Sequence, residues 1–350
     1  MMEQQKFLII GAGLAGPSLA HQLLKAGQSV TILDKGENYA TAIAAGMVNP
    51  MVFRRMNKSW RLDECMEDAI PFYKALEQQL KTQLYFPITI RRMFSSLQER
   101  EFWEKRQNLD EYKEYLTHIS EADNNYSKAT NEFGSGRLQQ AFWIDASAYY
   151  EGNRSYFRSI DCLLDEEFDL TQFDEKAASY KGITYDKIVF CCGYMNKYIP
   201  FFASAPVEQT KGQTLTIEST DLPEDESLNR KCFVLPLGEN TFRIGATYEW
   251  NDESLTTTET SKQLLLEHLS VLGNFSVKIN EQSVGVRPTV LDRRPIMGQH
   301  PEHRKLFIFN GLGTKGYLMA PTLAKDMCAF LLEGKELDKE VSLKRFEEKH

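Results

Sequence analysis

A glycine-rich turn near the start of the chain limits the possible folds more than any other feature of the sequence. Gly11, Gly13 and Gly16 follow the pattern G-x-G-x-x-G, with an apolar run at 6–10 before them and a helical pattern over 14–25 after them. In such a unit the first glycine permits the tight turn, the second leaves room for a pyrophosphate and the third lets helix and strand pack closely. The helix N-terminus then presents free N–H groups and partial positive charge to the phosphates. The turn therefore predicts a Rossmann-like βαβ unit that binds a dinucleotide.

A carboxylate at the end of the next predicted strand supports the same interpretation. The run 29–33 is a second apolar strand, and Asp34 follows it directly. An acidic residue at this point can accept hydrogen bonds from ribose hydroxyls and disfavours a 2′-phosphate. A helix–sheet turn that binds no ligand is the alternative. The predicted residues of this end of the site are Gly11, Gly13, Leu14, Ala15, Gly16, Asp34 and Lys35.

Strand patterns further along the chain point to a second domain inserted into the first. The 350 residues predict two domains. Apolar runs at 188–193 and 305–310 are typical of buried parallel strands, whereas 212–217, 232–235 and 241–246 alternate as antiparallel strands do. We therefore expect an α/β fold in which a Rossmann-like FAD-binding domain is interrupted by an α+β substrate domain with an antiparallel sheet. The return of the C-terminal segment to the cofactor domain favours FAD over NAD. The predicted FAD-binding domain comprises 1–58, 136–205 and 285–350, and the substrate domain 59–135 and 206–284.

Two regions between these strands carry simpler predictions. A helical pattern covers 59–80, and Pro71 within it predicts a kink or a break. Residues 121–136 are rich in Asn, Ser, Asp and Gly, so they predict an exposed connection.

Composition and charge exclude several classes of protein. No apolar run approaches the roughly 18–20 residues of a membrane-spanning helix, and the first residues lack a signal-peptide pattern. The formal net charge of −8 argues against a broad basic surface for nucleic acid. The cysteines at 65, 162, 191, 192, 232 and 328 form no C-x-x-C pair and predict neither a zinc site nor a disulfide framework. We expect a reduced, cytoplasmic protein that holds no metal.

Two motifs near the C-terminus narrow the cofactor and the chemistry. Arg287-Pro288 is followed by Asp292, Pro295 and Gly298, and then by the run 311–321, GLGTKGYLMAP. Together with the first glycine turn and the small-residue run 44–47, this order resembles the FAD-dependent amine and amino-acid oxidase family of glycine oxidase, sarcosine oxidase and D-amino-acid oxidase. The resemblance covers both ends of the chain and is weak between about 55 and 135.

The resemblance implies roles for individual residues. Arg287 takes the place of the arginine that grips a substrate carboxylate, a role suited to a bidentate guanidinium. Tyr248 falls where relatives place a substrate-facing side chain. Lys315 would add positive charge near the pyrimidine of the flavin, where reduced flavin is negative and a helix N-terminus also stabilises it. For each of these three residues a purely structural role is the alternative. The other cofactor residues implied are Ala45, Gly46, Met47, Phe168, Cys192, Gly193, Gly313, Thr314, Gly316, Tyr317 and Leu318.

The family also bears on how the flavin is held and what it does. Some sarcosine oxidases attach FAD through a cysteine just before the last glycine loop, but no cysteine lies between 233 and 327 here. We therefore predict non-covalent FAD. The expected reaction is oxidation of the C–N bond of a primary or secondary amine that bears a carboxylate, with hydride transfer to flavin N5. Oxygen or another acceptor then reoxidises the flavin.

Two other functions remain open at this point. The run 245–252 and the Thr314-Lys315-Gly316 loop also resemble the oxidase domain that acts on the carboxymethylaminomethyl group of a tRNA wobble uridine. That group is likewise a secondary amine with a carboxylate, so Arg287 would serve both substrates. The acidic balance counts against binding of tRNA unless a partner provides the grip. The third hypothesis is a protein that binds FAD without catalysis.

Overall fold

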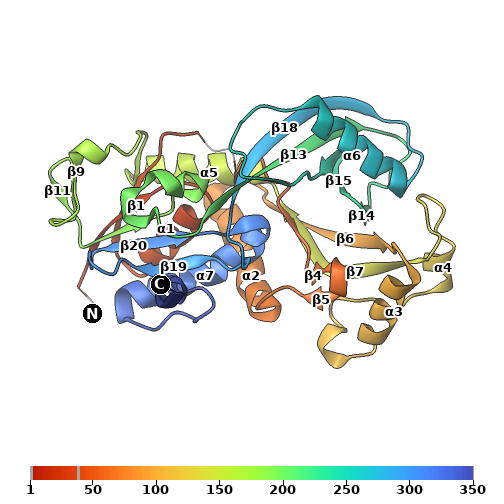
Figure 1. The fold of residues 1–350 in the computed structure, drawn as a ribbon, viewed down its shortest axis with the longest axis horizontal. Helices are drawn as coiled ribbons and strands as arrows, with labels where there is room; N and C mark the ends of the chain where they lie inside the picture. The colour runs from red at the N-terminus through yellow and green to blue at the C-terminus, as the bar shows by residue number, and fades with distance from the viewer. Residues whose placement is uncertain (1–2, 38–39, 350) are drawn as a thin grey trace.

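A largely parallel sheet forms one half of the protein, shown by a computed structural model that describes residues 3–37 and 40–349 (Figure 1). Its strand order is β19-β20-β12-β1-β2-β8, with β19 antiparallel to β20 and the other pairs parallel. In chain order its strands are β1 (Lys6–Ile10), β2 (Ser29–Leu33), β8 (Leu163–Leu164), β12 (Lys187–Phe190), β19 (Ile296–Gln299) and β20 (Leu306–Asn310). We call this the first sheet. It joins strands from both ends of the chain, as the apolar runs predicted.

Alternate side chains of β1 enter two cores, one on each face of the first sheet. Phe7 and Ile9 pack into the core under the helices, whereas Leu8 and Ile10 pack into a core shared with Phe190 and Phe202. This explains the continuous apolar pattern of the strand, since both faces are covered. The helices of this half are α1 (Ala15–Lys25), α2 (Leu62–Leu80), α5 (Ala146–Ser159) and α7 (Gly316–Glu333). A small antiparallel sheet of β9 (Phe173–Asp174), β10 (Ser179–Tyr180) and β11 (Ile183–Thr184) lies at the far edge.

A larger, mostly antiparallel sheet forms the other half, and we call it the second sheet. Its order is β17-β13-β16-β15-β14-β6-β7-β3, and β18 pairs with β13. Helix α6 (Glu259–Leu272) covers one face, where Leu265 and Leu269 pack against Leu215 and Ile244. On the opposite face, Ile90 and Leu138 pack against Trp103, and the strands farther along the sheet line the space toward the first sheet. The strands of the second sheet are β3 (Met47–Val48), β6 (Tyr85–Met93), β7 (Ser135–Ile144), β13 (Glu208–Glu218), β14 (Glu226–Asn229), β15 (Phe233–Gly238), β16 (Thr241–Gly245), β17 (Glu249–Trp250) and β18 (Lys278–Thr289).

The predicted fold class is confirmed, and two details differ from expectation. Helix α2 contains Pro71 but is not broken there. The region 121–136 includes the short helix α4 (Glu121–Asn124), whose Asp123 is buried in an ion pair with Arg91. The polar composition of this region could not reveal the burial of Asp123, because that burial depends on a charged partner from a distant part of the chain. The remaining elements are α3 (Leu97–Arg106), β4 (Met51–Val52) and β5 (Asn57–Lys58).

The sheet pairing also bears on the predicted domain boundaries, which remain a prediction. Strand β7 was expected in the FAD-binding part, yet it pairs with β6 in the second sheet. Strand β18 crosses the expected boundary at 284–285 and pairs with β13 along its whole length. In the part of the chain that the structure describes, no helix combines the length and apolar character needed to cross a membrane.

Candidate active site

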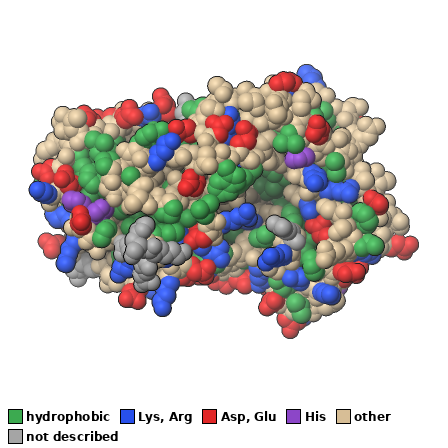
Figure 2. Space-filling model, in the orientation of Figure 1, with side chains coloured by type: hydrophobic (Ala, Val, Ile, Leu, Met, Phe, Trp, Pro, Cys, Tyr) green, Lys and Arg blue, Asp and Glu red, His purple; other side chains and the backbone are tan. Residues whose placement is uncertain are grey.

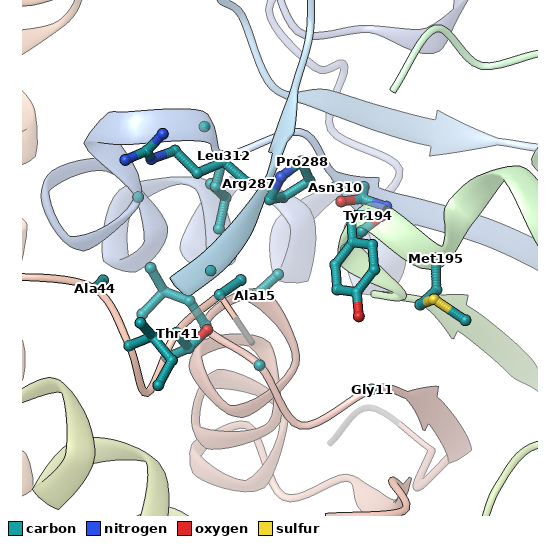
Figure 3. A pocket seen from close by; sticks show the side chains of 18 of the residues that line it. Gly11, Ala15, Thr41, Ala44, Tyr194, Met195, Arg287, Pro288, Asn310 and Leu312 are labelled. Carbon is teal, nitrogen blue, oxygen red and sulfur yellow. Dashed lines mark hydrogen bonds between the residues drawn. The ribbon is translucent and has the colours of Figure 1, made fainter. Parts of the chain in front are cut away.

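A cavity of about 940 Å³ lies where the two sheets face each other. Figure 2 shows hydrophobic side chains gathered around a hollow near the middle of the face of the molecule that it draws. Figure 3 shows that Gly11, Ala44 and Arg287 reach it from three separate parts of the chain. Of the predicted site residues, Gly16 and Leu318 lie outside the lining. Those that line it are Gly11, Gly13, Leu14, Ala15, Asp34, Lys35, Ala45, Gly46, Met47, Phe168, Cys192, Gly193, Tyr248, Arg287, Gly313, Thr314, Lys315, Gly316 and Tyr317.

The first glycine turn has the shape that a pyrophosphate requires. Gly11 has φ +108°, and a Cβ there would lie 2.5 Å from the carbonyl oxygen of Cys191. A Cβ at Gly16 would overlap the carbonyl oxygen of Gly11, so Gly16 acts on the packing of α1 from behind the cavity. Leu14, the N-cap of α1, provides no side-chain hydrogen bond to the helix. The first N–H groups of α1 therefore remain for a phosphate, and the turn fits the dinucleotide end of FAD.

Asp34 already has protein partners on both carboxylate oxygens. Its Oδ2 accepts a hydrogen bond from the Ala12 N–H at 2.8 Å, and its Oδ1 accepts one from the Gly36 N–H at 2.8 Å. Arg154 of α5 forms an ion pair with the same Oδ1. Each carboxylate oxygen can accept more than one hydrogen bond, so the predicted contact with ribose stays a prediction. No local pattern in the sequence points to Arg154, which is far from Asp34 along the chain.

The turn at 45–47 is held tightly against the second sheet. Gly46 has φ +69°, and a Cβ there would overlap the carbonyl oxygen of Ile144. Arg243 of β16 donates from Nη1 to the Ala44 carbonyl oxygen at 3.2 Å, and burial lowers the pKa of its guanidinium. The backbone of this turn is therefore fixed from two sides. Sequence analysis missed Arg243 because nothing in the alternating pattern of β16 distinguishes it from a solvent-facing arginine.

Arg287 projects from β18 into the cavity with much of its hydrogen-bonding capacity unused. Its Nη1 donates to the Thr247 carbonyl oxygen at 3.3 Å, and its Cζ lies 5.4 Å from the centre of the Tyr248 ring. Among the side chains that the structure describes, which exclude those of 1–2, 38–39, 54 and 347–350, no carboxylate pairs with it. Burial lowers the pKa of the guanidinium, although a cation with so high an ordinary pKa remains charged. A half-buried arginine without an acidic partner is suited to bind an anion.

Gly212 gives the guanidinium of Arg287 its place. A Cβ at Gly212 would overlap both terminal nitrogens of Arg287, so the arginine lies directly over this residue of β13. The two residues that flank Gly212 have structural roles. Lys211 and Gln213 do point to the other side, where Lys211 Nζ pairs with Asp252 at 3.1 Å and Gln213 Nε2 bonds Ser261 at 2.9 Å. Gly212 itself belongs to the cavity.

Lys315 joins the last glycine loop to the chain that follows the 45–47 turn. Its Nζ donates to the carbonyl oxygens of Asn49 and Met51, the second at 3.3 Å. Burial lowers the pKa of this ammonium group to about 8. Both carbonyl oxygens are neutral, so no anionic partner offsets the loss of water. The proposed electrostatic role toward flavin remains a prediction, since the observed bonds are structural.

This buried ammonium group predicts that the stability of the FAD-free protein depends on pH. Between a folded pKa of about 8 and the ordinary 10.5, the unfolded chain binds more protons at Lys315 than the folded chain does, so stability rises with pH. We expect the free energy of unfolding of the wild type, relative to Lys315→Met, to rise by about 3 kcal/mol between pH 7 and pH 10.5. Urea unfolding of both proteins across this range measures the difference. A pH-independent difference would contradict the assigned burial.

Several further residues of the lining have no signal in the sequence. They come from the short 3₁₀ helix after β12, from the middle of the second sheet and from the end of β20. The residues are Tyr194, Met195, Thr214, Asn229, Phe233 and Asn310. They are brought together by strand pairing over long separations, which a single sequence does not reveal. In the described chain, no group of three or more His, Cys, Asp and Glu residues is placed to hold a metal ion.

Comparison with known proteins agrees with this geometry. The family model described as FAD dependent oxidoreductase (DAO) matches residues 6–330. Glycine oxidase of Bacillus licheniformis is 24% identical over 369 residues, covering 95% of this chain and 94% of that protein. The crystal structure of glycine oxidase from Geobacillus kaustophilus superposes with a TM-score of 0.79 at 17% identity, covering 95% of this chain and 96% of the other.

A second group of relatives is longer than this chain. The tRNA 5-methylaminomethyl-2-thiouridine biosynthesis bifunctional protein MnmC of Marinobacter nauticus is 22% identical over 346 residues, which cover 91% of this chain but 54% of that protein. The cavity joins both ends of the chain as the predicted motifs required, and the family match extends over nearly all of it. The chain belongs to the DAO family of FAD-dependent oxidoreductases.

Proposed function

We propose that this oxidoreductase oxidises the C–N bond of a primary or secondary amine that bears a carboxylate, such as an amino acid or an N-substituted glycine. The observation that carries the proposal is the guanidinium of Arg287, which enters the cavity without an acidic partner among the described residues. A substrate carboxylate would complete its hydrogen bonds and offset its charge.

The lining residues provide positioning rather than acid–base chemistry near Arg287. The acidic residues of the described lining are Asp34, Glu37, Glu166 and Glu167, which follow β2 and β8 of the first sheet. The described lining contains no histidine. The amine must therefore arrive unprotonated. Arg287 and the Tyr248 ring beside it hold the carboxylate end, so the substrate is kept in one orientation before and during hydride transfer.

Bound FAD supplies the two-electron acceptor for a hydride from the carbon next to the nitrogen. The fixed turn at Gly46 and the start of α7 at Gly316 are the elements that would orient it. The substrate also loses the proton on its nitrogen, which passes to solvent, and leaves as an imine. Water adds to the imine carbon and releases an amine and a carbonyl compound, so atoms and electrons balance. Oxygen or another electron acceptor then reoxidises the flavin.

The test is anaerobic reduction of the purified holoenzyme by a panel of amines. Glycine, sarcosine, longer N-substituted glycines and primary D- and L-amino acids are mixed with the protein, and flavin absorbance is followed. We expect at least one carboxylate-bearing amine to bleach the flavin, whereas the matched amine without a carboxylate reacts far more slowly. No bleaching by any member of the panel would contradict the proposal.

A carboxymethylaminomethyl group on a tRNA wobble uridine is a second candidate substrate. Exposed aromatic rings of Tyr198, Tyr248 and Trp250 lie near the cavity, and such rings can stack on unpaired bases. The net charge of −8 opposes tRNA binding. Wobble nucleosides of a deletion strain, analysed together with a gel shift at low salt, separate the candidates. Unchanged nucleosides and no shift would remove the tRNA substrate.

A further inference from the structure

Glycines in the second sheet beside and beyond Arg287 make room for large side chains that lie across its face. The strand register places Gly285 opposite Gly212, and Gly245 opposite both Thr214 and Phe233. A Cβ at Gly245 would lie 2.7 Å from the Phe233 ring and 2.8 Å from the Thr214 methyl group. Phe233 therefore leans across Gly245, and its ring and Thr214 line the cavity. This part of the cavity therefore extends across the strands of the second sheet, from Thr214 past Phe233 to Asn229.

The part of the cavity between Arg287 and Asn229 is long compared with a simple amino acid. The Arg287 guanidinium lies over Gly212 of β13, and the last lining residue across the sheet is Asn229 of β14. These strands are separated by β16 and β15. Three strand spacings correspond to about 14 Å. Glycine or sarcosine held at Arg287 would leave most of that length empty.

Asn229 is turned so that its amide N–H₂ is available at the far end. Arg92 Nη1 donates to Asn229 Oδ1 at 2.6 Å, and Arg92 is itself fixed by an ion pair with Glu99 at 2.7 Å. Because arginine only donates, the amide oxygen must face Arg92 and the Nδ2 group is left over. No acceptor for Nδ2 is found in the part of the chain that the structure describes. A buried charge pair thus orients a neutral hydrogen-bond donor in the wall of the cavity.

We propose that Asn229 determines substrate specificity by binding a hydrogen-bond acceptor on the substituent of the amine, with Phe233 packing against the chain between. The preferred substrate is then an N-substituted glycine whose substituent crosses the Phe233 ring and ends in a carbonyl or similar acceptor. This inference rests on the proposed function, since the carboxylate must be held at Arg287 for the substituent to point toward Asn229. It names the class of amine that the cavity fits better than glycine.

The test measures kcat/KM of the holoenzyme for sarcosine and for two series of N-alkyl glycines of rising length. One series ends in a carboxamide and the other in an isopropyl group of similar shape. We expect a length optimum in the carboxamide series, with kcat/KM about tenfold above both sarcosine and the isopropyl compound of equal length. In Asn229→Ala the ratio between the two end groups should fall about tenfold.

Two further variants keep the result interpretable. Asn229→Asp has the same shape and can still accept from Arg92 but presents no N–H, so it should lose the carboxamide preference as the alanine variant does. Asn108→Ala, at an exposed asparagine just after α3, should retain the carboxamide preference. Equal rates for all lengths and end groups in the wild type would overturn this inference and leave the proposed function standing. A changed flavin spectrum in Asn229→Asp, with unchanged substrate preference, would also overturn it.

Discussion

Replacing Arg287 with alanine is expected to lower kcat/KM for carboxylate-bearing amines by two to three orders of magnitude while FAD stays bound. A bidentate pair provides two charge-assisted hydrogen bonds, which together stabilise the bound carboxylate by about 3–4 kcal/mol. Each 1.36 kcal/mol corresponds to a factor of ten in rate. The loss should fall mainly on KM, because the carboxylate is held before and during hydride transfer. Steady-state kinetics and the flavin content of the purified variant measure both parts.

Three companion variants separate charge from placement. Arg287→Lys retains the charge without the fork of donors, so its kcat/KM should lie between the wild type and the alanine variant. Gly212→Ala leaves the arginine intact but puts a methyl group where its terminal nitrogens lie, so the guanidinium must move and KM must rise. Arg158→Ala, at an exposed arginine of α5, should behave as the wild type. Unchanged kinetics in Arg287→Ala would show that the carboxylate binds elsewhere.

The sequence predicted those parts of the site that local backbone geometry determines. Gly11 and Gly46 occupy positions where a side chain would meet a backbone carbonyl group, so glycine there is visible as a local signal. Arg287 was identified through its place beside Pro288 in the family motif, and the structure puts it in the cavity lining. The strands 6–10, 29–33 and 306–310 were likewise predictable, because strands buried on both faces are continuously apolar.

What the sequence did not reveal depends on pairing between distant segments. Asn229 and Phe233 reach the cavity because β14, β15 and β16 pair in a particular register, and Arg243 reaches Ala44 across the two halves. None of these residue types is unusual in a strand. Leu318 shows where the motif and the lining part: the motif lines the cavity up to Tyr317, but the helical turn of α7 directs the Leu318 side chain into the core. A linear motif does not say where a helix turns its side chains.

Gly46→Ala is expected to reduce both the stability of the protein and its FAD content. A Cβ at this position overlaps the carbonyl oxygen of Ile144, and both partners are backbone that is tied into the second sheet. The residue also has φ +69°, which alanine adopts at a cost of about 1 kcal/mol. The displaced turn adds a steric cost, so we expect the free energy of unfolding to fall by more than about 2 kcal/mol. Urea unfolding and titration of the FAD-free protein with FAD measure the two effects.

Gly182→Ala is the matched control, because it separates backbone strain from the clash. Gly182 has φ +76°, and a Cβ there would find no atom within 4 Å. It should therefore lose about 1 kcal/mol of stability through strain alone and bind FAD as the wild type does. If Gly46→Ala behaved like Gly182→Ala, the turn would be free to move away from Ile144. Its rigidity could then not be the reason for a glycine at this point of the cavity.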